Sequence, residues 1–390
     1  MEFTRRDFGK IVVPAAAGLS IAGMANAAQS SKIDGVQIGA ITYSFRGAPP
    51  PNGTGVAAPD MPAAMQKIGL SEVELMSGDA EIIAGIPQAP GRGGGGFGGG
   101  RGGSGRGGGF GGRGGGAARG AQVAMAPNGC PANTPSGRDS IAKSGGAAPA
   151  AGRGPGGRGG NMTPEQQAEQ EAAQKKIADW KMAANATTWK GVKQKFNDAG
   201  VDIQILCYNM SLNTKDDEMD YAFQMARDMG VRAISCSTTV AVAKRVAPFA
   251  DKYKIMWAGH GHFNIYDAEE FARPETFSEI MSYSKYIGVN LDIGHFTQAG
   301  YDPLTYIPQI HDKITNIHLK DSMKPDKCGV AGPTQPWGQG QTAIKEVLLL
   351  MKKNKYKFPA NIELEYRIPD GSDSVAEVAK CYEFAKKCLA

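Results

Sequence analysis

Most of the histidines in this sequence stand where a short apolar segment ends. The chain contains five of them, all within one stretch: His260, His262, His295, His311 and His318. Four lie in the segments IMWAGHGH, VNLDIGH and ITNIHLKD, whose apolar runs are typical of buried strands. A further segment of this kind, PANIELEY, contains Glu363 and Glu365. Imidazole and carboxylate groups together are typical ligands of Mn²⁺, Co²⁺, Zn²⁺ or Fe²⁺, so the pattern predicts one divalent metal site, with the identity of the ion left open.

The segments that carry these side chains alternate with amphipathic segments that favour helices. Strands are expected at residues 36–43, 71–76, 201–207, 231–236, 254–259, 289–292, 314–318 and 358–363. Helices are expected at residues 59–68, 164–184, 188–199, 216–229, 240–253, 274–287, 303–311, 342–353 and 372–388. This alternation indicates a parallel sheet covered on both faces, and eight strand–helix units predict an α/β fold, the (β/α)8 TIM barrel. A doubly wound open sheet is the alternative, but no G-x-G-x-x-G follows the first strand.

The polar residues at the strand ends define the candidate site, because TIM barrels place their chemistry at the C-terminal ends of the strands. One histidine there is explained equally well by core packing, whereas three successive strand ends with carboxylates favour a shared site. Candidate substrate contacts come from the first, second and fifth strands: Tyr43, Arg46, Glu74 and Trp257. Lys320 is a candidate acid or base, or alternatively a structural partner of Asp321. The Gly- and Pro-rich segment 328–340 is a candidate lid, and His311, expected late in a helix, is set apart.

The N-terminus has the pattern of a twin-arginine signal peptide. Arg5 and Arg6 precede a modestly apolar run at residues 11–24, and Ala25-Asn26-Ala27 is typical of a cleavage site. We therefore expect residues 1–27 to be removed and residues 28–390 to form a periplasmic or secreted barrel without a transmembrane segment. The twin-arginine route exports folded proteins, which fits an enzyme that acquires its metal before export.

A Gly- and Arg-rich segment at residues 91–160 interrupts the barrel pattern after the second strand. It has too few large apolar side chains to offset the entropy of ordering it, so we expect a disordered insertion. Many of the arginines behind the net charge of +5 lie here, so that charge does not indicate a specific nucleic-acid partner for the folded part. A spacer is the favoured interpretation, with contact to anionic polymers or RNA as alternatives.

The six cysteines form no C-x-x-C pair, so a zinc knuckle is not expected. Cys207 and Cys236 fall in expected core strands and are expected to be buried thiols. Cys381 and Cys388 lie two turns apart on one expected helix, too far apart to form a disulfide with each other.

Several segments resemble the sugar phosphate isomerase/epimerase family, the xylose isomerase-like TIM barrels. The resemblance is carried by GVNLDIGHFTQAGYDP, ITNIHLKDS and PANIELEY, and D-x-x-H followed by H-x-K-D is its most specific part. It implies that Asp292, His318 and Glu363 hold the metal and that His295 contacts the substrate. At the fifth strand, where the epimerases commonly have a glutamate, this chain has His260, which resembles a branch of the family with an H-N-H motif. His260 is then the fourth ligand.

The resemblance implies a metal-dependent isomerase or epimerase that acts on a free or keto sugar. Glu363 is the candidate ligand and base, with Glu365 an alternative ligand, and His262 and Lys320 are candidate catalytic groups. With His260 in place of a glutamate, the symmetric glutamate pair of the 3-epimerases is missing, so a lyase or hydratase of 3-keto sugars is an alternative. An endonuclease-IV-like phosphodiesterase and a non-catalytic carbohydrate-binding protein are further alternatives. The sequence leaves a homo-oligomer open.

Overall fold

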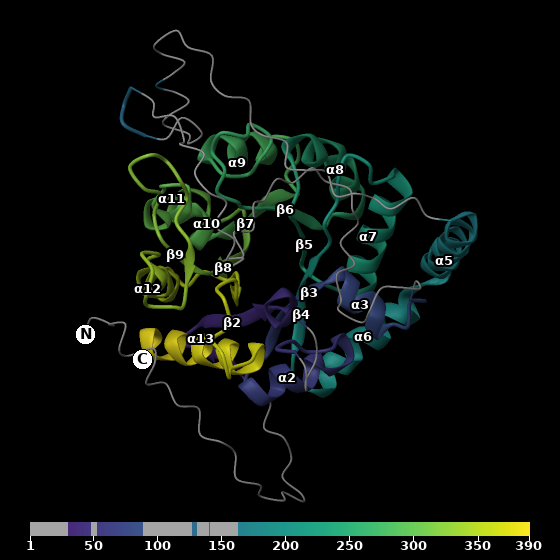
Figure 1. Ribbon diagram of the computed structural model, residues 1–390. Coiled ribbons are helices and arrows are strands. Elements are labelled where there is room, and N and C mark those ends of the chain that lie inside the picture. The colour runs from purple at the N-terminus through teal and green to yellow at the C-terminus, as the bar shows by residue number, and fades with distance from the viewer. Residues whose placement is uncertain (1–29, 48–52, 89–126, 131–139, 141–162) are drawn as a thin grey trace, which may run out of the picture.

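Parallel strands close into a barrel at the centre of the molecule (Figure 1). The computed structural model describes residues 30–47, 53–88, 127–130, 140 and 163–390. Within them the barrel strands are β2 (Val36–Ile41), β3 (Glu72–Met76), β4 (Asp202–Cys207), β5 (Ala233–Cys236), β6 (Met256–His260), β7 (Ile287–Asp292), β8 (Ile314–Leu319) and β11 (Ala360–Ile362). Each strand pairs with its neighbours in parallel, and β2 pairs with both β11 and β3, which closes the ring. The predicted (β/α)8 barrel is confirmed.

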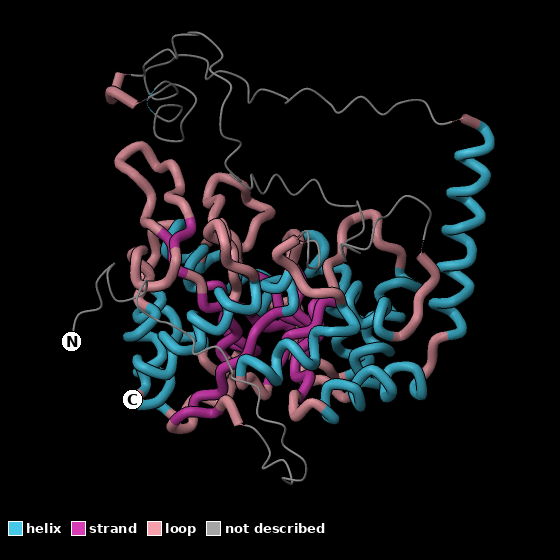
Figure 2. The backbone as a smooth tube through the Cα atoms, turned by 60° about the horizontal axis from the view of Figure 1, so that its bottom comes forward, coloured by secondary structure: helices cyan, strands magenta, loops and turns pink. Residues whose placement is uncertain are grey.

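The helices surround the barrel and cover the outer faces of its strands (Figure 1). They are α2 (Met61–Ile68), α3 (Ser77–Ile83), α5 (Pro164–Ala183), α6 (Ala186–Asp198), α7 (Asp216–Met229), α8 (Val240–Tyr253), α9 (Pro274–Met281), α10 (Ile293–Gln298), α11 (Pro303–Ile310), α12 (Ile344–Asn354) and α13 (Ser374–Leu389). Most bounds agree with the expected segments, but α9 ends six residues before the predicted 287. Helix α5 buries none of its residues and projects from the body, as Figure 2 shows.

Shorter elements complete the described chain. The 3-10 helices η1 (Thr42–Phe45) and η2 (Ala58–Asp60) lie near the N-terminal strands, and β1 (Lys32–Ile33) pairs antiparallel with β2. Strands β9 (Asp321–Ser322) and β10 (Thr334–Gln335) pair antiparallel after β8. Among the described helices, none combines the length and apolar character that a membrane span requires.

The barrel interior contains a column of fully buried polar side chains. Glu72 and Glu74 are two residues apart on β3 and therefore point to the same face, into the barrel, because strand side chains alternate. Asn361 Nδ2 donates to Glu72 Oε2 at 2.6 Å, and Asn316 Nδ2 donates to Glu74 Oε2 at 2.7 Å. A Cβ at Gly39 would lie 1.6 Å from Glu72 Oε2, so the glycine makes room for this carboxylate. These bonds join β3, β8 and β11 across the interior.

A disulfide joins the Gly- and Arg-rich segment to the loop after β8. It links Cys130 to Cys328, whose Cα atoms are 5.6 Å apart. The segment lies between α3 and α5, after the second barrel strand, as the sequence predicts. Apart from residues 127–130 and 140, the predicted insertion 91–160 lies outside the described residues, as does the predicted signal peptide 1–27. Cys207, Cys236, Cys381 and Cys388 are buried free thiols.

Candidate metal centre and pocket

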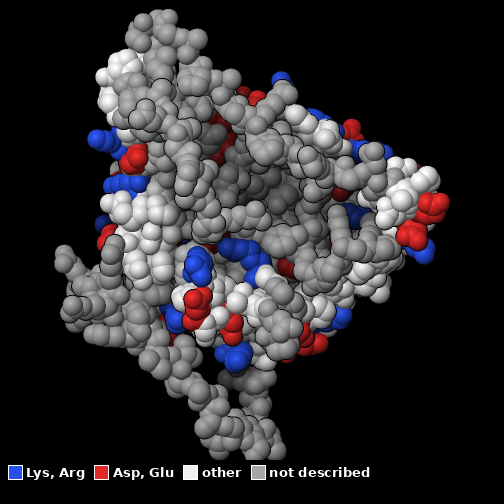
Figure 3. Space-filling model, in the orientation of Figure 1, with Lys and Arg blue, Asp and Glu red and all other residues white. Residues whose placement is uncertain are grey.

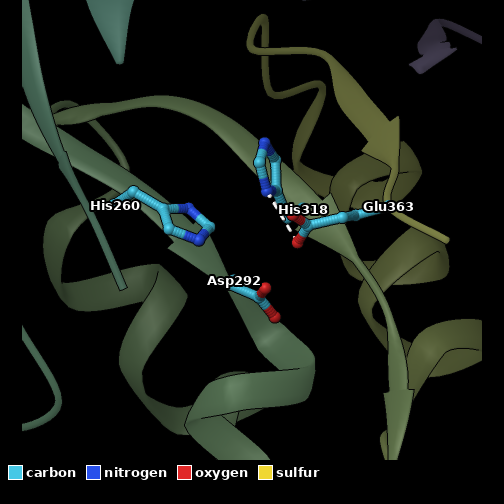
Figure 4. A group of neighbouring side chains, drawn as sticks. All are labelled: His260, Asp292, His318 and Glu363. Carbon is cyan, nitrogen blue, oxygen red and sulfur yellow. Dashed lines mark hydrogen bonds and ion pairs between the residues drawn. The ribbon is translucent and has the colours of Figure 1, made fainter. Parts of the chain in front are cut away.

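Four side chains from four neighbouring strands converge at the C-terminal end of the barrel (Figure 4). His260 ends β6, Asp292 ends β7, His318 lies on β8 and Glu363 follows β11 directly. Each offers a nitrogen or oxygen, and these atoms all lie within 4.8 Å of one another. All four residues are buried. The structure therefore brings together the four residues that the sequence predicts as metal ligands.

The donor atoms fit a divalent metal ion. Nδ1 of His260 is buried and has no hydrogen-bond partner among the described residues. Burial and the neighbouring His318 lower the pKa of His260 to about 4, so its imidazole is neutral with a free lone pair. His318 Nδ1 lies 3.1 Å from Glu363 Oε2, on the side that faces the other ligands (Figure 4). Two imidazole nitrogens and two carboxylates suit Mn²⁺, Fe²⁺, Co²⁺ or Zn²⁺.

Lys320 lies inside this site, and its alternative pairing with Asp321 is wrong. Its Nζ atom is 2.7 Å from Asp292 Oδ2, 2.9 Å from Glu363 Oε2 and 2.8 Å from Glu365 Oε2. Burial lowers the pKa of Lys320, but these carboxylates outweigh it and hold the pKa well above its usual value. Lys320 is therefore an ammonium group that pairs with all three carboxylates. The carboxylate of Asp321 instead accepts backbone N–H groups from the 328–340 segment and Thr342.

The segment 328–340, predicted as a lid, is fastened to the barrel at several points. Gly338 and Gly340 donate to Asp321, and Trp337 is fully buried with its ring edge-on to Phe384. Gln298 Nε2 also donates to the carbonyl of Gly332 at 2.6 Å. These contacts favour a fixed loop over a segment that opens, and none of the described residues that line the cavity belongs to it.

His295 and His262 stack beside the four candidate ligands. Their ring centroids are 5.2 Å apart, and the rings are nearly parallel. Nε2 of His295 lies 2.9 Å from Lys320 Nζ, and because an ammonium only donates, this nitrogen is the acceptor. Nδ1–H of His295 then donates to Gln298 Oε1 at 2.7 Å. His262 Nε2 is 2.6 Å from Ser237 Oγ, and burial lowers the pKa of His262 well below its usual value, so this ring is neutral.

The local backbone explains how His295 reaches the site. Asp292 is the N-cap of α10, and its Oδ1 accepts the backbone N–H of His295 at 2.8 Å. A short aspartate side chain favours this position because its oxygen satisfies a free helix N–H. One oxygen of this carboxylate therefore caps the N-terminus of α10, and the other contacts Lys320. The D-x-x-H motif in the sequence therefore corresponds to an N-cap aspartate and the residue three positions later whose N–H it accepts.

Glu74, predicted as a substrate contact, lies behind His318 and forms its bonds to protein groups. Its Oε2 is 2.6 Å from His318 Nε2, and it also accepts from Ser235 Oγ and from the amide groups of Asn290 and Asn316. The residue is fully buried, and it is one of the residues that line the pocket. Its described partners are side chains of β5, β7 and β8, so it supports the site from the barrel interior.

The three remaining predicted contacts differ in position. Tyr43 lines the pocket. Arg46 lies with its guanidinium carbon 4.4 Å from the centre of the Tyr43 ring and donates to the carbonyl of Leu364, so it supports Tyr43. Trp257 is fully buried, with its ring edge-on to Phe271. Barrel packing accounts for Trp257, and the structure does not support its prediction as a substrate contact.

A cavity of about 250 Å³ opens beside the candidate ligands. Among the lining residues that the sequence predictions missed, three are polar residues that follow a strand: Asp79 on α3, Asn209 after β4 and Ser237 after β5. All three come within three residues of a strand end. Polar residues are common at such positions, and so nothing in the sequence sets these three apart.

On the described part of the face in Figure 3, basic and acidic side chains lie interspersed.

The comparisons with known proteins identify the family. Residues 168–387 match the family described as the xylose isomerase-like TIM barrel. The chain belongs to this family. The match covers the barrel from α5 through most of α13 and includes all four candidate ligands of this xylose isomerase-like barrel. No curated protein matches the sequence.

Solved structures share the fold at low sequence identity. One is a probable 3-DHS dehydratase involved in petrobactin synthesis from Bacillus anthracis, at 10% identity and a TM-score of 0.48, covering 90% of this chain and 99% of that one. Another is a sugar phosphate isomerase/epimerase from Parabacteroides distasonis, at 13% identity and a TM-score of 0.47, covering 91% of this chain and 96% of that one. At these values the likeness carries no argument about the reaction of the present chain.

Proposed function

We propose that this chain is a metal-dependent enzyme that isomerises or epimerises a free or keto sugar by removing a proton next to a carbonyl. The observation that carries the proposal is the convergence of His260, Asp292, His318 and Glu363 beside a cavity at the C-terminal end of the barrel. A divalent ion held by these four residues supplies a Lewis acid that polarises a carbonyl or hydroxyl group. Everything else in the reaction is assigned to the side chains around it.

Glu363 and Lys320 are the proposed acid–base pair. Burial raises the pKa of Glu363, but Lys320 and His318 outweigh it and hold the pKa well below its usual value, so Glu363 is in the carboxylate form that a base requires. Nζ of Lys320 lies 2.9 Å away and carries the proton that we assign to the return step. His262 lines the cavity as a neutral ring and binds a substrate hydroxyl. His295 lines the same wall and holds Lys320 in place through Nε2.

The lining of the cavity favours a neutral, polyhydroxylated substrate. The lining contains carboxyl groups and, among the described residues, neither lysine nor arginine; the carboxyl groups are those of Glu74, Asp79, Glu363 and Glu365. Lys320, behind this lining, is already paired with three carboxylates. A phosphate group would therefore meet carboxylates and no cation free to pair with it among the described lining residues, whereas sugar hydroxyls can donate to the carboxylates.

A lyase or hydratase of 3-keto sugars is the second candidate. The observation that favours it is that His260, a neutral imidazole, stands at the ligand position on β6 where the two-glutamate epimerases have a carboxylate. A symmetric proton exchange across the sugar needs a base on each side, whereas an elimination needs one base and one acid. Glu363 and Lys320 meet the second requirement. The phosphodiesterase and non-catalytic alternatives find no comparable support among the described residues.

Export through the twin-arginine route is part of the proposal. The predicted signal peptide would direct the barrel to the periplasm or outside the cell. The Cys130–Cys328 disulfide supports this, because disulfides persist mainly in oxidising compartments.

Metal analysis and hydrogen exchange together test the proposal. The mature chain is purified, its metal content is measured, and it is incubated with free and 3-keto sugars in D₂O while C–H exchange is followed by NMR. We expect one divalent ion per chain and metal-dependent exchange at a carbon next to the carbonyl. His260→Ala should lose the metal. In the control, His311→Ala, the metal should be retained, because the His311 ring stacks on Tyr356 and is not one of the four candidate ligands. A chain that binds no divalent ion after reconstitution contradicts the proposal.

A further inference from the structure

Glu74 accepts hydrogen bonds from several sides at the centre of the barrel. Ser235 Oγ and Asn290 Nδ2 donate to its Oε1, the latter at 3.3 Å, and Asn316 Nδ2 donates to its Oε2 at 2.7 Å. The carboxylate is fully buried, so these groups are its surroundings in place of water. His318 Nε2 completes the set at 2.6 Å from Oε2.

The two nitrogens of His318 therefore face opposite ways. Nδ1 faces Glu363 and the other candidate ligands, and Nε2 faces Glu74. Asn290 Nδ2 is also 3.1 Å from Nε2, but the carboxylate contact is the shorter one and places the proton on Nε2. Nδ1 also faces a carboxylate, that of Glu363, so in the metal-free chain it donates as well. A metal ion at the four residues would take the place of the proton on Nδ1, while the proton on Nε2 stays with Glu74. A carboxylate that accepts the second N–H of a ligating histidine fixes its tautomer and its ring orientation.

We propose that Glu74 is a positioning residue that holds His318 with Nδ1 toward the metal centre and Nε2–H toward the barrel interior. The inference rests on the proposed function in one respect, namely that a metal ion binds at the four converging residues. It assigns to Glu74 a role other than substrate contact and other than ligand.

The polar column keeps Glu74 from turning away. Asn316, which donates to Glu74, also donates to Asn361 Oδ1 at 3.1 Å, and Asn361 donates to Glu72 at 2.6 Å. The four residues come from β3, β8 and β11, and all are fully buried. Rotation of the Glu74 carboxylate would break its hydrogen bonds to side chains of β5, β7 and β8 together. These bonds therefore hold the carboxylate in one orientation.

The matched variants are Glu74→Gln and Glu72→Gln. Both remove a buried carboxylate from the same face of β3, but only Glu74 contacts His318. Burial raises the pKa of Glu72 well above its usual value, so glutamine mimics the neutral form that it has in the folded chain. The metal affinity of each metal-free protein is measured with Co²⁺ and Zn²⁺ by competition with a chelator. The visible absorption of the Co²⁺ form and urea unfolding of the metal-free form are recorded in parallel.

We expect Glu74→Gln to bind both ions about 10- to 100-fold more weakly, with a changed Co²⁺ spectrum, because a neutral amide holds the imidazole less firmly. Glu72→Gln should bind them as wild type does, whatever its stability. Equal affinity and an unchanged spectrum in wild type and Glu74→Gln overturn the inference while leaving the proposed function intact. An equal loss in Glu72→Gln also overturns it, because the effect is then a general one of the polar column. A wild-type chain that binds no metal contradicts the proposed function and the inference with it.

A structure of the Zn²⁺-loaded wild-type chain tests the inference without any variant. Nδ1 of His318 on the metal, with Nε2 within hydrogen-bond distance of Glu74, supports the inference. Nε2 on the metal overturns it. This measurement decides the matter even if Glu74→Gln does not fold.

Discussion

Lys320 and Asp292 form an ion pair, with 2.7 Å between Nζ and Oδ2, inside the cluster that fits a metal ion. The same ammonium contacts Glu363 and Glu365, so one cation balances three carboxylates that are largely removed from water. Its removal leaves buried negative charge without compensation, which is one of the costliest changes in a protein interior.

We therefore expect Lys320→Met to lower the free energy of unfolding of the metal-free chain by about 3–5 kcal/mol. A saturating divalent ion should restore part of this loss, because it compensates the same carboxylates and binds only the folded state. Urea unfolding with and without Zn²⁺ measures both effects. Lys175→Met, which breaks the exposed pair with Asp179, is the control and should change stability by less than about 1 kcal/mol. Equal stability of Lys320→Met and wild type would show that the ion pair is unimportant.

His262 separates substrate binding from metal binding. It lines the cavity and contacts Ser237, but it is not one of the four converging ligands. We expect His262→Gln to keep a full complement of metal and to lower the rate of C–H exchange about 10-fold, because one hydrogen bond to the substrate is lost. Elemental analysis beside the exchange assay distinguishes the two effects. Metal loss in His262→Gln would mean that His262 is a ligand.

Much of the barrel was predictable because its strands are apolar runs between amphipathic helices. The four ligands were predictable because parallel strands bring their C-terminal ends to one edge, so each strand end contributes to the same place. Helices α3 and α10 were missed, since seven and six residues are too few to show a helical period. The role of Glu74 was also missed. Alternation in a strand tells which face a side chain occupies, but not which residue of another strand meets it there.

Two further features depend on contacts distant in sequence. Cys130 and Cys328 are 198 residues apart, and no spacing rule joins them. Lys320 stands next to Asp321 in the sequence, which suggests a pair, but Lys320 lies between β8 and β9, and the two side chains contact different parts of the protein. In the structure, Lys320 contacts Asp292 in the candidate metal centre, and Asp321 accepts a backbone N–H from Gly338 in the 328–340 segment.

The free energy of unfolding is expected to depend on pH through Asp79, and a single variant can separate this contribution from that of other groups. Burial raises its pKa from 3.8 to about 6, although a hydrogen bond from Thr42 opposes this. The folded state therefore holds the proton more tightly than the unfolded state, and stability is highest below about pH 4 with respect to this group. It falls as the pH rises to about 6, by at most about 3 kcal/mol, and stays level above that.

Asp79→Asn should abolish this component. The difference in unfolding free energy between wild type and Asp79→Asn, measured from pH 4 to pH 7 by urea unfolding, should fall and then level off near pH 6. Asp321, whose pKa burial also raises to about 6, is present in both proteins and cancels in the difference. A difference that stays constant over this range would contradict the assignment.

Gly39 is expected to tolerate no side chain. A Cβ there would lie 1.6 Å from Glu72 Oε2 and 2.8 Å from Asn361 Nδ2, in the middle of the barrel interior. Gly39→Ala should therefore destabilise the fold by about 3 kcal/mol or more. Gly191→Ala on α6 is the matched control, since its Cβ would meet nothing within 4 Å and the helix should gain up to about 1 kcal/mol. Thermal unfolding of the two variants checks the contrast, and comparable midpoints would refute it.

The disulfide also gives the molecule an unusual connectivity. The bond between Cys130 and Cys328 makes residues 130–328 a covalent ring, and this ring contains strands β4 to β8. β2 and β3 belong to one tail outside the ring and β11 to the other, and the two tails meet where β2 pairs with β11. A protease that cuts once between residues 131 and 162 opens the ring but releases no fragment. The two pieces would therefore run as one band on a non-reducing gel and separate only when a thiol is added.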